Sequence, residues 1–288
     1  MELRKISEEE LAEMLREHKK WLDSNGEKGK RADLSYTDLR KTNLSAANLF
    51  KVYLFRADLS RANLSGANLL GIDLHRANLF KANLSRANLS GANLPGVNLS
   101  GADLSGADLF RTNLFRANLS GANLLEAGLF RANLFAADLI GTNLGYANIS
   151  GANFYNAELN GAKLDGIKYD DTTQYFALQC PEKGEFVAYK KAYDSELRLP
   201  RIVKLLIPAD ALRSSATTEK CRCNKAKVLS ITSLDDKRKY QKASSRYDAT
   251  FIYEVGETVE VSDFDKDRWK ECAPGIHFFM RRMDAVNY

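Results

Sequence analysis

Residues 82–91 read ANLSRANLSG, and this five-residue unit recurs along nearly half of the chain. Every fifth residue from Leu34 to Leu164 is Leu, except Ile149 and Phe154, with no insertion or deletion. The residue two places before each Leu is usually Ala, and the residue between them is usually Asn or Asp. The repeating unit is therefore Ala-(Asp/Asn)-Leu-x-x.

A period of five fits neither a long helix nor an extended strand. A helix with about 3.6 residues per turn would spread these Leu side chains around its whole circumference, and a strand would alternate them between its two faces. The remaining arrangement is a solenoid in which each pentad forms one short side of a coil. The Leu and the small residue then point inward, and the other three residues point outward, where Asn, Asp, Gly and Ser suit the bends.

The repeat over residues 31–166 resembles the pentapeptide-repeat family. This resemblance implies an all-β solenoid, a right-handed quadrilateral β-helix with four pentads per coil and ladders of Leu and Ala along its axis. An open end of such a solenoid exposes unpaired backbone and apolar side chains. We therefore expect both ends to be covered.

Residues 1–30 are expected to form an N-terminal capping helix and its connector. Ser7 followed by Glu10 forms a capping box, and apolar residues recur at helical spacing as far as Leu22. We expect this helix to close the first coil, with Gly29 in the connector. Binding of a partner by the helix is the alternative interpretation.

The period ends near Gly166, and residues 167–288 are expected to form a separate, strand-rich α+β domain. Pro208 is expected to open a short helix that carries Asp210 to Arg213. Segments such as GEFVAYKK and CAPGIHFF resemble an uncharacterised domain found behind pentapeptide repeats in bacterial and phage proteins, and this resemblance implies no activity. Strand-like runs cover Tyr175–Leu178, Glu185–Tyr189, Ile202–Ile207, Lys227–Thr232, Thr250–Val255, Thr258–Val261 and Ile276–Met280.

The composition and the charge exclude several classes of protein. A chain of 288 residues with 44% hydrophobic and 27% charged content has enough apolar surface to fold. It has no apolar run near the roughly 18 residues that span a bilayer and no signal-peptide core at its start, so we expect a cytoplasmic protein without a membrane segment. Some pentapeptide-repeat proteins are acidic rods that imitate duplex DNA and bind type II topoisomerases. The 13 basic and 10 acidic residues of residues 31–166 disfavour such mimicry here.

The four cysteines raise the question of a metal site. Cys180, Cys221, Cys223 and Cys272 all lie in the C-terminal domain, and in a reducing compartment they indicate free thiols before disulfides. Cys221, Cys223 and Cys272 with His277 could supply tetrahedral zinc ligands, but Cys-x-Cys on a strand lacks the usual zinc knuckle. We expect free thiols, no metal and no cofactor.

A few residues of the C-terminal domain suggest an alternative function, as an enzyme or a small-ligand-binding protein. Lys190 and Arg213 could bind an anionic ligand, and His277 stands between a Pro-Gly turn and an apolar strand. A structural, hydrogen-bonded histidine is the simpler interpretation of His277. We find no complete set of catalytic partners, so the sequence favours a protein that is not an enzyme.

Counting in twenties places the outward residues on four faces, and two neighbouring faces carry Phe side chains that are often followed by Arg or Lys. Exposed Phe and Arg are typical of a protein-binding surface. Two alternatives are that the rings stack on one another and need no partner, or that they bind single-stranded nucleic acid. We therefore expect a non-enzymatic protein-interaction scaffold with a protein partner. The candidate binding residues are Phe50, Phe55, Phe110, Arg111, Phe115, Arg116, Phe130, Arg131 and Phe135.

Overall fold

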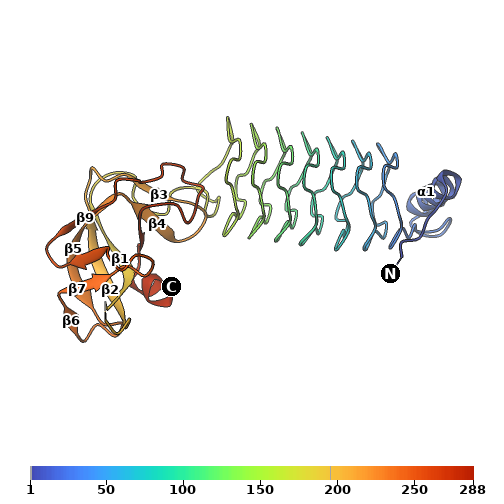
Figure 1. The fold of residues 1–288 in the computed structure, drawn as a ribbon. Coiled ribbons are helices and arrows are strands. Elements are labelled where there is room, and N and C mark those ends of the chain that lie inside the picture. Colours follow the sequence, from blue (N-terminus) through green and yellow to red (C-terminus); the bar gives the residue numbers. More distant parts are fainter. Residues whose placement is uncertain (1, 195) are drawn as a thin grey trace. The chain divides into compact units, whose positions relative to one another are not determined.

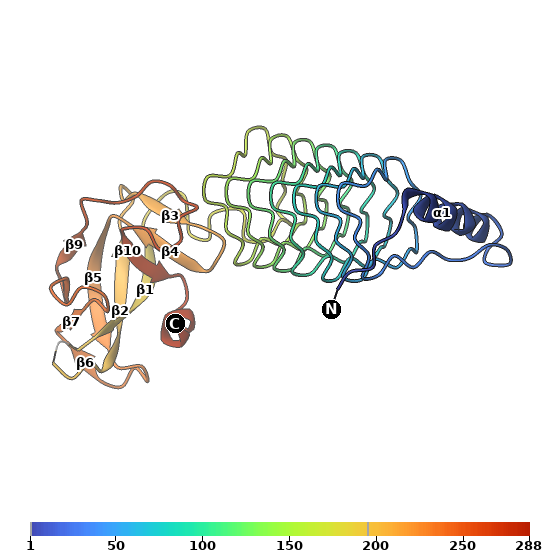
Figure 2. The ribbon, with the colours of Figure 1, turned by 45° about the vertical axis from the view of Figure 1, so that its right-hand side comes forward.

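The computed structural model describes residues 2–194 and 196–288 (Figures 1 and 2). The chain divides into two compact units, Met1–Gln174 and Tyr175–Tyr288. This division lies beyond Gly166, where the sequence period ends, because Asn153 still forms a parallel bridge with Gln174. Within the described ranges, no helix is both long enough and apolar enough to cross a membrane.

The first unit begins with the predicted helix, α1, which spans Glu8–Asp23. Ser7 is its N-cap, and its Oγ accepts a hydrogen bond from the backbone N–H of Glu10 at 3.1 Å. Glu8, Glu9 and Glu10 lie in the first turn, where carboxylates interact favourably with the helix dipole. The helix predicted from the capping box is therefore confirmed.

His18 joins α1 to the repeat region. Its side chain is 1% exposed, and its Nε2 donates to the carbonyl of Phe50 at 3.0 Å. Its Nδ1 accepts from the backbone N–H of Ala32 at 3.3 Å. Because Nδ1 is an acceptor here, the ring is neutral and carries its proton on Nε2. Burial is the main reason that the pKa of His18 is lowered.

The repeat region forms stacked coils, as Figures 1 and 2 show. Parallel bridges join residues that lie 20 positions apart, so that Asn83 pairs with both Asn63 and Asp103. Each coil therefore contains four pentads. At the N-terminal end, Arg4 forms a parallel bridge with Thr37 and extends the same ladder.

The interior of the coils contains the residues that the pattern predicts. The Leu side chains from Leu34 to Leu159, with Ile149 and Phe154, are at most 1% exposed. Thr112 takes the position usually held by Ala, and its Oγ1 donates to the carbonyl of Leu89 at 2.8 Å. A buried hydroxyl is therefore accommodated because it has a hydrogen-bond partner.

The corner of each pentad is a turn with two recurrent hydrogen bonds. In the pentad of Leu84, the backbone N–H of Ala87 donates to the carbonyl of Leu84 at 3.0 Å, and Arg86 has a positive φ of 55°. A type II turn requires such a left-handed residue at its third position. The Oδ1 of Asn83 accepts from the backbone N–H of Ser85 at 3.0 Å, which explains why Asn or Asp precedes most of the Leu residues.

The second unit is built around an antiparallel sheet. In the described residues the order of its main path is β3-β4-β10-β1-β2-β5-β6, while β7 pairs with β1 and β8, and β9 pairs with β5. The elements are β1 (Phe186–Tyr193), β2 (Pro200–Ile207), β3 (Arg213–Ser215), β4 (Lys220–Cys223), β5 (Lys225–Thr232), β6 (Lys239–Tyr240), β7 (Lys242–Ser244), β8 (Ile252–Glu254), β9 (Thr258–Glu260), β10 (Ile276–Phe279) and the helix α2 (Arg282–Asn287).

The core of the second unit lies mainly on one face of this sheet. Ala188 and Ala192 of β1 belong to it, together with Val203, Tyr253 and Phe278, each at most 1% exposed. A smaller cluster contains Ile202, Phe279 and Ala285, the last of which belongs to α2. The helix therefore packs on part of the opposite face, since neighbouring residues of a strand point to opposite sides.

The sequence interpretation of this unit is right for six strands, wrong for one strand and one helix, and does not include β3, β4, β6 and β7. The predicted runs match β1, β2, β5, β8, β9 and β10, but Tyr175–Leu178 forms turns and not a strand. The helix expected after Pro208 is also absent from the described residues. The N–H of Ala211 closes a single turn on the carbonyl of Pro208 at 3.0 Å, and Arg213 then pairs with Cys223 on β4. Strand pairing thus outweighs the local preference for a helix.

Candidate functional site

The outward Phe residues of the repeat form ladders along neighbouring coils. Phe110 and Phe130 have ring centroids 5.8 Å apart and planes inclined by only 8°. Phe115 and Phe135 are 5.4 Å apart, and Tyr155 continues this ladder at 5.3 Å from Phe135. Phe110 and Phe130 are therefore stacked, whereas the ring planes of Phe115 and Phe135 are inclined by 33° and those of Phe135 and Tyr155 by 55°. Their side chains are half-buried, so each presents an edge to the solvent.

A basic side chain covers almost every outward Phe. Arg111, Arg116 and Arg131 are exposed, and each guanidinium lies 5.0–5.1 Å from the centroid of the Phe before it. This is the range of a cation–π contact. We call the set of Phe110, Arg111, Phe115, Arg116, Phe130, Arg131 and Phe135 the aromatic–arginine band.

Phe50 and Phe55 lie apart from this band. The carbonyl of Phe50 accepts the hydrogen bond from His18 of α1, and Lys51 lies 5.0 Å from the Phe50 ring. The ring centroid of Phe55 lies 6.0 Å from that of His75 and 5.4 Å from that of Tyr36. Sequence counting missed Tyr36, because this residue stands at the left-handed position of its pentad and not at the position of the Phe rings. The nine candidate residues thus form two groups.

The basic residues of the band take a conformation that favours glycine. Arg111, Arg116 and Arg131 have φ values of 53°, 53° and 58°. Other pentads place Gly here, and at Gly91 and Gly121 an added Cβ would meet nothing within 4 Å. A left-handed conformation costs a residue with a side chain roughly 1–2 kcal/mol relative to the right-handed one. The band therefore carries arginine where the backbone alone would prefer glycine.

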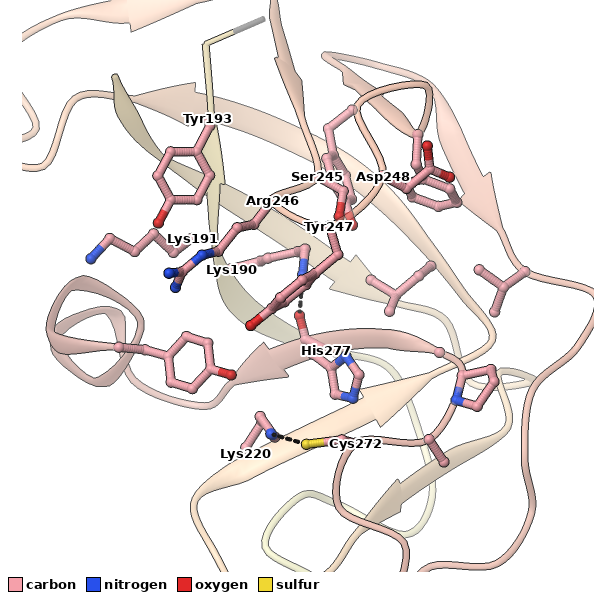
Figure 3. Close-up of a pocket in the computed structure, with 18 of the residues that line it drawn as sticks. Lys190, Lys191, Tyr193, Lys220, Ser245, Arg246, Tyr247, Asp248, Cys272 and His277 are labelled. Carbon is pink, nitrogen blue, oxygen red and sulfur yellow. Dashed lines mark hydrogen bonds between the residues drawn. The ribbon is translucent and has the colours of Figure 1, made fainter. Parts of the chain in front are cut away.

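The structure brings together two of the three candidate ligand residues of the second unit. Lys190 of β1 and His277 of β10 both line a cavity of about 520 Å³, and the Nζ of Lys190 donates to the carbonyl of His277 at 3.2 Å (Figure 3). Burial is the main reason that the pKa of Lys190 falls to about 8 and that of His277 to about 4. His277 is therefore neutral at physiological pH.

Arg213 does not line this cavity. Its guanidinium donates to backbone carbonyls, among them those of Pro208 at 2.8 Å, Ala209 at 2.9 Å and Gly184 at 2.9 Å. These bonds join the segment before β1 to the segment after β2 and leave little of the guanidinium for an anionic ligand. The structure therefore places Arg213 away from the cavity that Lys190 and His277 share, at the start of β3, which pairs with β4.

The cysteines do not form a metal centre in the part of the chain that the structure describes. All four are free thiols; Cys180, Cys221 and Cys223 are buried, and Cys272 is exposed. No three His, Cys, Asp or Glu side chains of residues 2–194 and 196–288 lie close enough together to hold a metal ion. Burial raises the pKa of Cys223 to about 12.

Two families match the sequence. Residues 30–54, 57–96, 93–127 and 132–168 match the pentapeptide repeats, and residues 176–285 match DUF5758, a family of unknown function. No protein of curated function matches the chain.

Several solved structures of repeat proteins are similar to the first unit. HetL, a pentapeptide repeat protein involved in heterocyst differentiation regulation in the cyanobacterium Nostoc sp. strain PCC 7120, is 36% identical; the match covers 47% of this chain and 73% of HetL, with a TM-score of 0.33. A second pentapeptide repeat protein of Nostoc PCC 7120, alr5209, is 36% identical. The match covers 39% of this chain and 84% of alr5209, with a TM-score of 0.20. QnrB1, a plasmid-mediated fluoroquinolone resistance protein, is 25% identical. The match covers 49% of this chain and 78% of the QnrB1 chain, with a TM-score of 0.40. The chain therefore belongs to the pentapeptide-repeat family and carries a DUF5758 domain behind its repeats.

Proposed function

We propose that this protein is a non-enzymatic scaffold that binds a protein partner through the outer faces of a right-handed, quadrilateral β-helix. Membership of the pentapeptide-repeat family supports this proposal, since such proteins act through interactions with other proteins. The stacked coils also offer a long surface of regularly spaced side chains, which suits recognition of another macromolecule.

The observation that carries the proposal is the pairing of Phe with a basic residue at the left-handed corner. Six outward Phe residues are each followed by Arg or Lys, at 5.0–5.6 Å from the ring. A glycine would fit each corner with less strain, so stability alone does not account for the arginines. Aromatic and arginine side chains supply most of the binding energy in many interfaces. The pairs are Phe50-Lys51, Phe55-Arg56, Phe80-Lys81, Phe110-Arg111, Phe115-Arg116 and Phe130-Arg131.

The chemistry of the band also describes the partner. Three guanidinium groups are exposed beside half-buried ring edges, and none of Arg111, Arg116 and Arg131 forms an ion pair within the described residues. A surface that places carboxylates over the guanidinium groups and apolar side chains over the ring edges would be complementary. We infer a partner with an acidic and apolar patch.

The decisive experiment replaces arginine by glycine at the corners. The triple variant Arg111→Gly, Arg116→Gly, Arg131→Gly removes the exposed charges and relaxes the left-handed corners, so the coils should melt at or above the wild-type temperature. A matched control, Arg61→Gly with Arg86→Gly, removes charge at corners that follow Ser and not Phe; their φ values are 61° and 55°.

The readout is the affinity for a partner identified by mass spectrometry after capture on the wild-type chain. We expect the triple variant to bind this purified partner at least about tenfold more weakly, from the loss of charge-assisted contacts, while the control binds as the wild type does. Equal binding by the triple variant and the control would show that the band is not the interface.

A second variant separates binding by the rings from stacking of the rings. Phe110, Phe115, Phe130 and Phe135 are replaced together by Ser, which the corner accepts elsewhere: the Oγ of Ser85, for example, donates to Oδ1 of Asn83 at 2.7 Å. The proposal predicts lost affinity with an intact fold. Lower thermal stability with unchanged affinity would show that the rings only stabilise the coils.

A further inference from the structure

The cavity of the second unit opens at a divided edge of β1. One edge of β1 pairs with β2 along its whole length. The other edge is shared, since Tyr189 pairs with Phe279 of β10 and Tyr193 pairs with Ser244 of β7. Lys190, Lys191 and Ala192 lie between these two partners. The cavity of about 520 Å³ is lined by residues from this stretch and from the segments that flank β10 and β7.

Lys190 extends its side chain on the core side of the sheet. It lies between Ala188 and Ala192, which share its face of β1 and are fully buried. Its Nζ contacts the carbonyl of His277 and lies 5.8 Å from the ring of the buried Tyr253. No ion pair of the described residues includes Lys190. An ammonium in such surroundings is stabilised by a counter-charge, which the chain itself does not supply.

The other charges around the cavity are mostly positive. Lys191, Lys220 and Arg246 line it with Lys190, against the carboxylates of Asp248 and Asp263. Lys220 is partly neutralised by Glu271, 3.4 Å away. The positive charge of Lys220 contributes, after burial, to the lowered pKa of Lys190, so the two ammonium groups repel each other. An anion between them would relieve this repulsion.

His277 contributes its backbone carbonyl to the contact with Lys190, and its ring lies on the other face of the sheet. Because Tyr189 pairs with Phe279, the side chains of His277 and Phe279 lie on the face of Tyr189, opposite to that of Lys190. The Nε2 of His277 is buried and has no hydrogen-bond partner within the described residues.

Aromatic side chains surround the mouth of the cavity. Tyr247 is 82% exposed and Tyr288 is 51% exposed, although both line the cavity. Phe251 and Tyr193 provide further apolar surface. The guanidinium of Arg246 lies 5.7 Å from the ring centroid of Tyr247, so that a flat ring and a positive charge lie next to each other in the wall of the cavity (Figure 3). Exposed tyrosines next to cations suit a ligand that is planar at one end and anionic at the other.

We propose that this cavity is a binding site for a mononucleotide. Lys190, Lys220 and Arg246 would hold the phosphate, and Tyr247 and Tyr288 would stack on the base. The volume of about 520 Å³ lies within the range of small-molecule sites. This site is separate from the aromatic–arginine band, so it does not depend on the scaffold function.

The test is calorimetric titration of the full chain with the four ribonucleoside monophosphates at low salt and neutral pH. Inorganic phosphate and the matching nucleosides are titrated in parallel. We expect at least one nucleotide to bind about tenfold or more tightly than either phosphate or its nucleoside, since only the nucleotide uses both the cations and the rings. The triple variant Arg111→Gly, Arg116→Gly, Arg131→Gly should leave this affinity unchanged, which distinguishes the cavity from the band.

Two variants and a control examine the residues. Lys190→Met and Tyr247→Ala should each weaken nucleotide binding about tenfold, since each removes one of the two kinds of contact. Lys239→Met removes an exposed lysine of β6 outside the cavity and should have no effect. Wild-type affinity should also fall as the pH rises through about 8, where Lys190 loses its proton, and this dependence should be absent in Lys190→Met.

Three results would overturn the proposal. One is the absence of any nucleotide binding with a Kd below about 1 mM. Another is unchanged affinity in a folded Lys190→Met variant. The third is inorganic phosphate binding as tightly as every nucleotide, which would make the cavity a simple anion site.

Discussion

Replacing Leu84 by Ala tests the assignment of inward and outward positions in the coils. Leu84 is completely buried, and its counterparts one coil away on each side, Leu64 and Leu104, are also completely buried. Removing three carbons loses about 2.4 kcal/mol of burial at ~0.8 kcal/mol per carbon, and the cavity left behind brings measured losses for such changes to about 2–5 kcal/mol. The ladder on either side cannot collapse into the gap, because backbone bonds such as that from the N–H of Leu84 to the carbonyl of Asp103, 2.6 Å, hold the coils apart.

We therefore expect a loss of about 3 kcal/mol, which for a unit of this size lowers Tm by roughly 6–12 °C. Circular dichroism of the full chain measures this change as a function of temperature. Ser85→Ala, at the next residue, is the control: Ser85 is half-buried and donates one hydrogen bond to Asn83, worth about 1 kcal/mol.

A charge at the same two positions makes the contrast sharper. Leu84→Lys would place an ammonium group inside the coil without a partner, so this variant should not form the coils at all. Ser85→Lys should fold almost as well as the wild type. If the two lysine variants lose similar stability, the assignment of Leu84 to the interior is refuted.

Three further predictions concern the cap and the second unit. Gly29→Ala should destabilise the first unit by more than about 2 kcal/mol, because an added Cβ would collide with the carbonyl of Glu17. Gly121 also has a positive φ but has open space around it, so the control Gly121→Ala should destabilise the unit by only about 1 kcal/mol. Thermal melts of the two variants measure this difference. Stability of the first unit should be complete above pH ~6.5 and should decrease as the pH falls below that value, because His18 has a lowered pKa when folded and the unfolded chain takes up the proton first. Melts at several pH values measure this effect, and a His18→Gln variant that keeps the same acid dependence would contradict the assignment. Residues 175–288 should fold when expressed alone, as shown by dispersed amide signals in an NMR spectrum; an aggregated fragment would mean that its core needs the coils.

Much of the first unit follows from the sequence because its contacts are local and repeated. The spacing of five allows only one set of inward residues, and every coil repeats this set. A single residue that departs from the pattern, such as Thr112 in place of Ala, therefore does not change the prediction. The N-cap at Ser7 is equally local, since it depends on a residue three positions away. The pattern did not show the left-handed conformation of the corner. This conformation places each Arg over the ring of the preceding Phe and brings Tyr36 next to Phe55.

The second unit depends on contacts between residues far apart in the sequence, which only the tertiary structure determines. Lys190 and Lys191 are equivalent in the sequence, but strand alternation directs Lys190 toward the core side and Lys191 toward α2, where its Nζ donates to the carbonyl of Val286 at 3.0 Å. Arg213 and His277 were both candidate ligand residues in the sequence. Their strands, β3 and β10, pair with opposite edges of β4, and only His277 lines the cavity. The cavity itself exists because β10 and β7 share one edge of β1. Periodicity therefore determined the coils, whereas the candidate ligand site required the pairing of strands, which is decided by packing over the whole unit and not by any single stretch of sequence.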